Sequence, residues 1–167
     1  LCPKDVLLSS CALRKAGLEG MIAQIARDMA YPLVVKPNKQ GSTIGLTVVR
    51  ASEDLESSIL NAFKYDDEVL VEEYISGTEI TVGVLGNDQP QALPVIEIRS
   101  VTGLYDYEAK YTPGMSEHVI PAEIEDHVYR TVQEGALKAH RALGCRGISR
   151  SDFIVTPGNE AYILEVN

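Results

Sequence analysis

Apolar residues recur at helical spacing in three stretches of the chain. The first, residues 17–30, is followed by Pro32, a residue that ends helices. The second begins at Ser52, a predicted N-cap, and two acidic residues favour the first turn. The third covers residues 123–143 and ends before Gly144. The positions that should face a core are Leu18, Ile22, Ile25 and Met29 in the first helix, Leu55, Ile59 and Phe63 in the second, and Ile124, Val128, Val132, Ala136 and Leu143 in the third.

Between the helices, short apolar or alternating runs rich in β-branched residues predict strands. The stretch from Ser100 to His118 is polar and aromatic without periodicity, so we predict a long loop there. Long loops in compact domains are often functional. The predicted strands are a run ending at Lys36, residues 46–50, 68–74, 79–86 and 90–98, and a closing hairpin of GISRSDFIV and AYILEVN.

Helices and strands in this order predict an α+β protein with two lobes. We place the first lobe at residues 1–75 and the second at residues 76–167, with the change near the Ser76-Gly77 break. A length of 167 residues with 45% hydrophobic content is enough to bury a core.

The stretch VVKPNKQGSTIG, residues 34–45, joins two predicted strands of a hairpin. Glycine lets a backbone approach an anion closely, and a lysine at a strand end can meet that anion as a point charge. The stretch fits neither the P-loop nor the Rossmann pattern, because its lysine precedes the glycines. Two interpretations stay open here, a phosphate-binding loop and an ordinary hairpin turn.

Alternation along the last two strands sorts their residues into two faces. If Val155 pairs with Glu160, the polar residues of both strands share one face. The polar face then consists of Arg150, Asp152, Glu165 and Asn167, and the apolar face of Phe153, Val155, Tyr162, Leu164 and Val166.

The polar face carries ligand types that suit a metal ion. Mg²⁺ takes oxygen ligands, and it often sits on one or two carboxylates with phosphate completing its shell. We therefore expect Asp152, Glu165 and Asn167 to bind metal. The alternative is a surface salt bridge between Arg150 and the acids. A separate lysine and glycine loop favours the first interpretation, because together they could hold a metal-nucleotide.

The charge balance limits the kinds of partner. A formal net charge of -9 argues against nucleic acid and against anionic membranes, which need a basic surface. Three cysteines without C-x-x-C spacing indicate neither a disulfide framework nor zinc, and we expect a reducing, cytoplasmic setting. We expect the three histidines to be structural or surface residues. No apolar run is as long as a membrane span and no signal peptide is evident. The chain lacks an initial methionine and stops within a strand pattern, so we expect a piece of a longer protein.

Five segments together closely resemble the ATP-grasp fold and, within it, the D-alanine–D-alanine ligase family. The resemblance begins at about Tyr31 and continues to the end of the chain. It implies two α+β lobes with mostly antiparallel sheets and a nucleotide bound between them. The segments are VVKPNKQGSTIG, VLVEEYISGTEITVGVLG, YDYEAKY, GCRGISRSDF and LEVN.

The resemblance implies a role for each residue that matches a family motif. Residues 40–45 would close over the ATP phosphates through backbone amides, including that of Gly41, with Ser42 near the substrate. An alternative for Glu72 and Glu73, as solvated residues of an edge strand, stays open. The implied nucleotide contacts are Lys36 on phosphate, Glu72, Glu73 and Ile75 on adenine, and Glu79 on ribose.

The same resemblance assigns the catalytic groups. Lys110 would meet the transferred phosphoryl group, and Tyr111 would lock the closed loop together with Ser42. Arg150 would stabilise the tetrahedral oxyanion. The metal ligands Asp152, Glu165 and Asn167 would hold two Mg²⁺, or Mn²⁺, ions.

The implied activity is ATP-dependent joining of two D-alanines through an acyl phosphate, for peptidoglycan precursors of the cell wall. The family is usually dimeric. Tyrosine at Tyr111 goes with an amine acceptor in the family. Family members also carry an N-terminal domain and a segment after the last asparagine, so we expect this chain alone to be inactive. Two alternatives stay open, another ATP-grasp carboxylate–amine ligase and a noncatalytic nucleotide-binding module.

Overall fold

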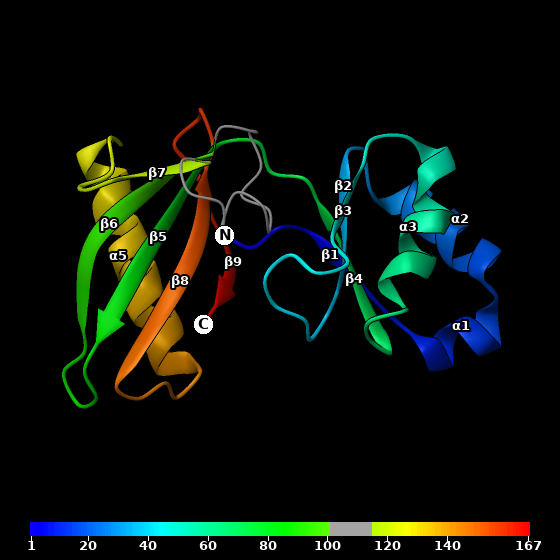
Figure 1. Cartoon of the computed structure of the whole chain (residues 1–167), viewed down its shortest axis with the longest axis horizontal. Coiled ribbons are helices and arrows are strands. Elements are labelled where there is room, and N and C mark those ends of the chain that lie inside the picture. The colour runs from blue at the N-terminus through cyan, green and yellow to red at the C-terminus, as the bar shows by residue number, and fades with distance from the viewer. Residues whose placement is uncertain (101–114) are drawn as a thin grey trace. The chain divides into compact units, whose positions relative to one another are not determined.

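The computed structural model describes residues 1–100 and 115–167, which form two compact units (Figure 1). The smaller unit is Pro3–Tyr74, and the larger is Ile75–Asn167 together with Leu1–Cys2. The first two residues join the larger unit because Leu1 hydrogen-bonds alongside its last strand. The Leu1 amino group donates to Ala161 O over 3.1 Å, and Ile163 N–H donates to Leu1 O over 2.9 Å. The sequence had placed these two residues in the first lobe.

In the smaller unit, helices cover one side of a four-stranded antiparallel sheet with the order β1-β4-β2-β3 (Figure 1). The core lies between them and includes Ile25, Leu33, Leu55 and Ile59, each 0% exposed. The elements are β1 (Asp5–Ser9), α1 (Ser10–Ala16), α2 (Leu18–Asp28), β2 (Leu33–Pro37), β3 (Thr47–Val49), a 3₁₀ turn (Ser52–Asp54), α3 (Leu55–Ala62) and β4 (Glu68–Glu73).

The predicted helix over residues 17–30 and the β2–β3 hairpin are confirmed. The prediction of Ser52 as N-cap is wrong. Ser52 starts the 3₁₀ turn, and its hydroxyl donates to the Glu53 carboxylate over 3.3 Å. The α-helix begins two residues later than predicted, where burial of Leu55 fixes its position. Strand β1 and helix α1 had not been predicted.

The larger unit is a five-stranded antiparallel sheet with the order β7-β6-β5-β8-β9, and α5 packs across one face (Figure 1). Alternate strand residues such as Ile80, Val82 and Val95 meet Val128 and Val132 of the helix in the core. The elements are β5 (Thr78–Leu85), β6 (Gln91–Ser100), β7 (Ser116–Val119), α5 (Asp126–Ala142), β8 (Ile148–Val155) and β9 (Ala161–Val166).

The predictions for Ser116–Val119 and for Leu143 need correction. Ser116–Val119 had been assigned to a loop, but it pairs with β6 as strand β7. Leu143 had been placed on the apolar face of α5, but it is 66% exposed because the helix ends at Ala142. The last buried helix residue is His140, whose Nδ1 lies 2.8 Å from Ser149 Oγ, so the prediction of a structural histidine is confirmed.

The register of the last hairpin differs from the predicted one. Val155 pairs with Ala161 rather than with Glu160. A bulge between Asp152 and Phe153 then adds one residue to β9, Leu164, and this brings Glu165 opposite Asp152. Near the turn, Ala161 and Ile163 therefore pack on the core, and Tyr162 lies opposite Ile154 on the other face.

None of the helices in the described part of the chain has the length and apolarity that crossing a membrane requires.

Candidate active site

Lys36 and Glu72 form an ion pair on neighbouring strands of the smaller unit. The Lys36 Nζ lies 2.6 Å from Glu72 Oε2, and the two side chains are 23% and 10% exposed. The interpretation of Glu72 as an edge residue is wrong, because β4 lies between β1 and β2. An ammonium group has three donors, so Lys36 can keep Glu72 and still donate to a phosphate oxygen.

The glycine loop joins β2 to β3 at the tip of the predicted hairpin. Its turn from Gly41 to Ile44 is closed by a bond from Ile44 N–H to Gly41 O of 3.3 Å. Ser42 and Thr43 have φ of 55° and 58° in this turn. Left-handed backbone costs about 1–2 kcal/mol for each residue other than glycine. Other contacts must therefore hold the turn in shape.

The two glycines of this loop have different surroundings. Gly45 has φ 74°, and a Cβ there would lie 2.7 Å from Tyr65 Cδ2 and 2.9 Å from Pro37 Cγ, so the packing requires glycine. At Gly41 a Cβ would meet nothing within 4 Å. The open side of Gly41 is where an anion could approach the backbone.

Glu73 is the last residue of β4, and both its backbone and its side chain form hydrogen bonds with Lys4. Its N–H donates to Lys4 O over 2.9 Å, and its Oε1 accepts from Lys4 N–H over 2.8 Å. A role for Glu73 on adenine therefore falls to the backbone carbonyl. Ile75, the other predicted adenine contact, is the first residue of the larger unit's main segment.

In the larger unit, Asp152 is the centre of a polar face on the side of the sheet opposite α5. Arg150 donates to it twice, from Nε to Oδ1 and from Nη2 to Oδ2, each over 2.9 Å. Thr81 Oγ1 donates to Oδ1 over 2.6 Å, and Asn167 Nδ2 donates to Oδ2 over 3.2 Å. A carboxylate has about four acceptor positions, and these donors fill them.

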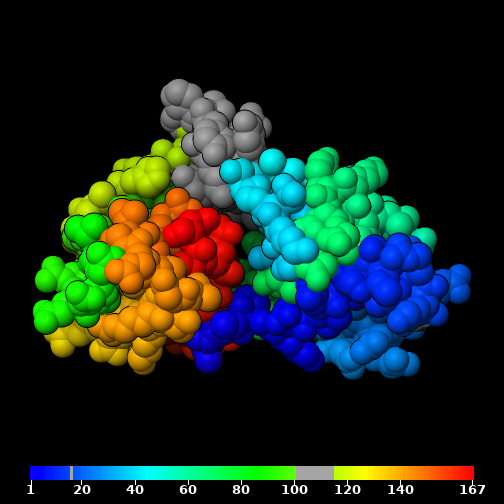
Figure 2. Space-filling model, turned by 90° about the horizontal axis from the view of Figure 1, so that it is seen from below, coloured from blue at the N-terminus to red at the C-terminus, as the bar shows by residue number. Residues whose placement is uncertain are grey.

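The remaining polar residues extend this face. Glu165 lies opposite Asp152 on β9 and is exposed, and Figure 2 shows the end of β9, in red, at the surface beside β8 in orange. Glu79 is two residues from Thr81 on β5, so it points to the same side. Arg150, Asp152, Glu165 and Asn167 thus share one face as predicted, and the predicted salt bridge between Arg150 and Asp152 is present too.

Sequence reasoning missed Thr81, the donor nearest to Asp152. Alternation from Glu79 along β5 was the available signal, since residues i and i+2 share a face. Lys110 and Tyr111 lie outside the described residues. Among the residues that are described, no group of three or more His, Cys, Asp or Glu is placed to hold a metal ion. A metal on the polar face would rest on Asp152, Glu165 and the Asn167 amide oxygen.

The larger unit also has an open hollow of about 820 Å³ where β5 and α5 begin. It is lined by Gly77, the 156–159 turn and the acidic residues Glu123, Glu125 and Asp126. Of the predicted site residues that the structure describes, none is among its lining residues. Its acidic side chains would repel a phosphate, so we keep the candidate site on the residues described above.

Comparison with known proteins relates these features to a family. The sequence model described as "D-ala D-ala ligase C-terminus" matches residues 10–167. A D-alanine–D-alanine ligase of Desulforamulus reducens is 52% identical over 99% of this chain and 53% of its own length. A homologue with the same name from Pelotomaculum thermopropionicum is 46% identical over 99% of this chain and 52% of its own length.

Solved structures have the same fold. The VanG D-Ala:D-Ser ligase from Enterococcus faecalis superposes with a TM-score of 0.82 and 37% identity, over 99% of this chain and 47% of that chain. This chain spans about half the length of the curated relatives it matches. The family's sequence model matches nearly the whole chain, and the ligases named above are about half identical to it. The chain belongs to the D-alanine–D-alanine ligase family and has the α+β ATP-grasp fold of that family's C-terminal part.

Proposed function

We propose that the full-length protein joins two D-alanines into D-alanyl-D-alanine at the expense of ATP, for use in peptidoglycan precursors. The observation that carries the proposal is the 52% identity, over 99% of this chain, with a protein named D-alanine–D-alanine ligase. The arrangement of Lys36, Glu72, Arg150 and Asp152 supports it, because each offers the charge that the reaction needs.

The chemistry accounts for this set of residues. A carboxylate is a poor electrophile, so the γ-phosphoryl group of ATP is first transferred to the carboxylate of one D-alanine. The resulting acyl phosphate has a good leaving group. The amine of the second D-alanine attacks the carbonyl carbon, and inorganic phosphate leaves. Catalysis then rests on positioning and on charge neutralisation.

The family's motifs assign the ATP contacts to individual residues. Lys36 donates to its phosphates, and the backbone N–H groups of Gly41 and Ser42 bind them from the loop. Glu72 accepts from the adenine amino group, and the backbone of Glu73 and Ile75 reads the ring edge. Glu79 accepts from the ribose hydroxyls. The ion pair of Lys36 with Glu72 supports this, since it fixes a cation next to an acceptor.

The donor set of the polar face suits Mg²⁺ or Mn²⁺, which take oxygen ligands. Asp152, Glu165 and the Oδ1 of Asn167 are the residues that would hold the metal. When bound, the metal neutralises charge on the phosphates. Because Asn167 now donates to Asp152 through Nδ2, its amide must turn to present Oδ1. Arg150 must likewise lose part of its hydrogen bonding to Asp152.

Arg150, released in this way, stabilises the oxyanion that forms when the amine attacks. Lys110 neutralises the transferred phosphoryl group. Tyr111 holds the closed loop together with Ser42, and the closed loop excludes water, which would hydrolyse the acyl phosphate. These roles follow from matching the family's motifs residue by residue.

The setting of the activity is also a proposal. ATP is a cytoplasmic substrate, so we place the reaction in the cytoplasm. We propose a homodimer for the full-length protein. We further propose that the 167-residue chain alone does not turn over, because its relatives are about twice as long. Ligation by the isolated chain would overturn this last point.

A second acceptor is favoured by one observation. The superposing E. faecalis enzyme is named a D-Ala:D-Ser ligase, so D-serine in the second position is the competing assignment. Both assignments start from the same acyl phosphate of D-alanine. The difference lies only in which amine attacks.

Product identification tests the proposal. The full-length protein is incubated with Mg-ATP and D-alanine, L-alanine, D-serine or D-lactate, alone and in pairs, and the products are identified by mass spectrometry. We expect D-alanyl-D-alanine and ADP, both lost in Lys110→Ala. If D-alanyl-D-serine is the main product, the acceptor is D-serine rather than D-alanine. If another acid and amine are joined, both substrate assignments are wrong. If Mg-ATP binds but no product forms, the protein is a noncatalytic nucleotide-binding module.

A further inference from the structure

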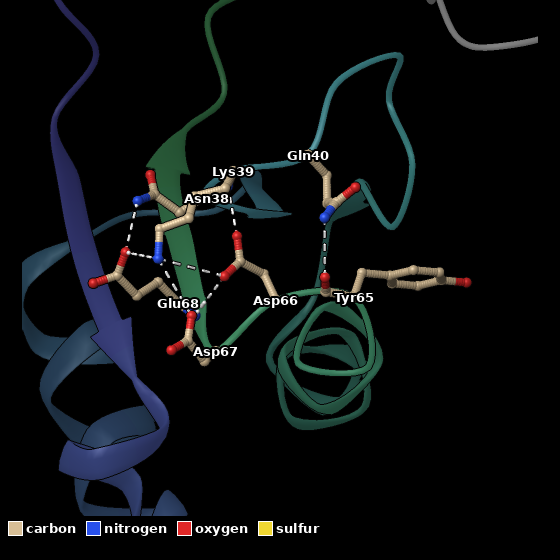
Figure 3. A network of polar contacts seen from close by, with 7 residues as sticks. All are labelled: Asn38, Lys39, Gln40, Tyr65, Asp66, Asp67 and Glu68. Atoms are coloured by element: carbon tan, nitrogen blue, oxygen red, sulfur yellow. Dashed lines mark hydrogen bonds and ion pairs between the residues drawn. The ribbon is translucent and has the colours of Figure 1, made fainter.

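The base of the glycine loop is fastened to the turn that leads into β4 (Figure 3). The three residues that follow β2, Asn38 to Gln40, contact residues 65–68. Asn38 pairs with Glu68 through backbone and side chain, over 2.9 and 3.1 Å. Gln40 Nε2 donates to Tyr65 O over 3.1 Å. These contacts fix the direction in which the glycine loop leaves β2.

Asp66 is the most buried side chain of this group, at 4% exposed. Its Oδ2 accepts from Lys39 N–H over 2.6 Å, and its Oδ1 accepts from Glu68 N–H over 3.2 Å. One carboxylate thus joins the backbone at the start of the loop to the backbone at the start of β4. Burial raises the pKa of Asp66, but the Lys39 and Glu68 backbone N–H groups, together with Asp67 and the Lys39 charge, bring that pKa below its ordinary value.

The Lys39 ammonium contributes less to this fastening. Its Nζ lies 3.1 Å from Glu68 Oε2 and 3.3 Å from Asp67 Oδ1, but the Lys39 side chain is 60% exposed. Exposed ion pairs of this kind add little, since water competes for both charges. The hydrogen bond from the Lys39 backbone to buried Asp66 is the contact that decides where the loop begins.

The loop needs such a fixed base because its turn is strained. Ser42 and Thr43 are both left-handed, and Thr43 is β-branched. At the far end, Gly45 packs closely against Tyr65, the residue that also accepts from Gln40. Both ends of the loop are therefore held against residues 65–68.

We propose that Asp66 is a positioning residue for ATP binding, which fixes the direction of the Gly41 and Ser42 N–H groups before the nucleotide arrives. This rests on the proposed function, in which those groups bind the phosphates. Asp66 acts through the Lys39 backbone and touches no substrate. A preorganised loop loses less conformational entropy when the nucleotide binds, so the affinity for ATP depends on this carboxylate.

Amide hydrogen exchange of the full-length protein without nucleotide tests the fastening. Asp66→Asn should make residues 40–45 exchange about tenfold faster or more, while the amides of β2 and β4 keep their rates. Asp67→Asn is the matched control, because that neighbouring side chain is 74% exposed. It should change the loop by less than twofold. Equal loop rates in wild type and Asp66→Asn would overturn the proposal.

Steady-state kinetics supply the functional measurement. Asp66→Asn should raise KM for ATP about tenfold and leave KM for D-alanine nearly unchanged, whereas Asp67→Asn should match wild type. Equal effects on both KM values, or none, would overturn the positioning role. If Asp66→Asn does not fold, Asp66→Glu replaces it, with selective loop exchange as support and unchanged exchange as refutation. If wild type ligates no D-alanine, the proposed function fails, and the exchange comparison alone still decides whether Asp66 fixes the loop.

Discussion

Asp152 is the residue on which the polar face of the larger unit converges. It accepts from Arg150, Thr81 and Asn167 at once, and its side chain is only 21% exposed. A carboxylate held by so many donors has a fixed direction, which suits a metal ligand. The same donors compete with a metal, so binding requires Asn167 and Arg150 to rearrange while Thr81 keeps the carboxylate in place.

Thr81 provides a test of this view. Thr81→Val keeps the shape of the side chain and suits a strand, but it removes the 2.6 Å hydrogen bond to Asp152. We expect the apparent affinity for Mg²⁺ and kcat to fall about tenfold each, because a hydrogen bond to a charged group is lost. A metal titration of ligase activity measures this. Thr81→Ser, which retains the hydroxyl, should behave like wild type, and equal losses in both variants would contradict the role.

The two loop glycines give a second prediction at this scale. Gly45→Ala should lower the free energy of unfolding by about 2 kcal/mol or more, because the new Cβ meets Tyr65 and Pro37 at a left-handed φ. Gly41→Ala should change it by less than about 0.5 kcal/mol, since open space surrounds that position. Thermal unfolding measures both.

Nucleotide binding then separates structure from function in the same loop. Gly41→Ala should weaken ATP binding while the protein stays fully folded, because the Cβ occupies the side from which a phosphate approaches. Wild-type affinity in Gly41→Ala would show that the loop is only a hairpin turn, which is the alternative that the sequence left open.

The composition of the polar face was predictable from residue types and alternation. Acidic and amide residues two apart on a strand share a face, and that placed Asp152, Glu165 and Asn167 correctly. The Lys36–Glu72 ion pair was not predictable in the same way. It depends on which strands are neighbours, and no local pattern shows that β4 lies inside the sheet rather than at its edge.

At the scale of elements, the β8–β9 hairpin shows where periodicity fails. The predicted pairing of Val155 was wrong by one residue, yet Glu165 still faces Asp152 because the bulge shifts the register again. The shared polar face was therefore predicted correctly although the register was not. Bulges arise from how a strand fits its neighbours and its helix, so neither error nor compensation was visible in the sequence. The same holds for β7, whose polar residues are strand only because β6 pairs with them.

A cluster of Glu97, Arg99 and Glu123 links β6 to the segment before α5. Glu97, 7% exposed, accepts from Arg99 Nε over 2.7 Å and from Glu123 N–H over 3.1 Å, and Arg99 also binds the Glu123 carboxylate. The hydrogen bond from Arg99 lowers the pKa of Glu97, burial raises it, and the Glu123 N–H lowers it further, so the pKa lies below its ordinary value.

The ionisation of Glu97 in this cluster predicts how the stability of the fold depends on pH. Because the folded pKa of Glu97 is depressed, its contribution is complete above the unfolded pKa of about 4.3 and is lost as the pH falls through the folded value. Glu97→Gln should therefore be less stable than wild type at pH 7, and the difference should shrink below about pH 4. Urea unfolding at several pH values measures it. A difference that stays constant down to pH 2 would rule out an electrostatic origin.

At the scale of the whole molecule, the two units have separate cores and separate sheets. The order of helices and strands was enough to predict two α+β lobes, because each lobe is built from neighbouring segments. The assignment of Leu1–Cys2 to the larger unit was not predictable, since it depends on hydrogen bonds to β9, some 160 residues away. Family membership adds the fold, and the reaction remains the central claim to be tested.

Transfer of an isotope label from D-alanine to phosphate tests that claim most directly. The full-length protein is incubated with Mg-ATP and D-alanine that carries ¹⁸O in its carboxylate, and the phosphate released is examined by mass spectrometry. An acyl phosphate requires that each phosphate released with D-alanyl-D-alanine carries one ¹⁸O, because the carboxylate oxygen that attacks the γ-phosphorus leaves with it. Unlabelled phosphate, or label found in AMP instead, would contradict the account.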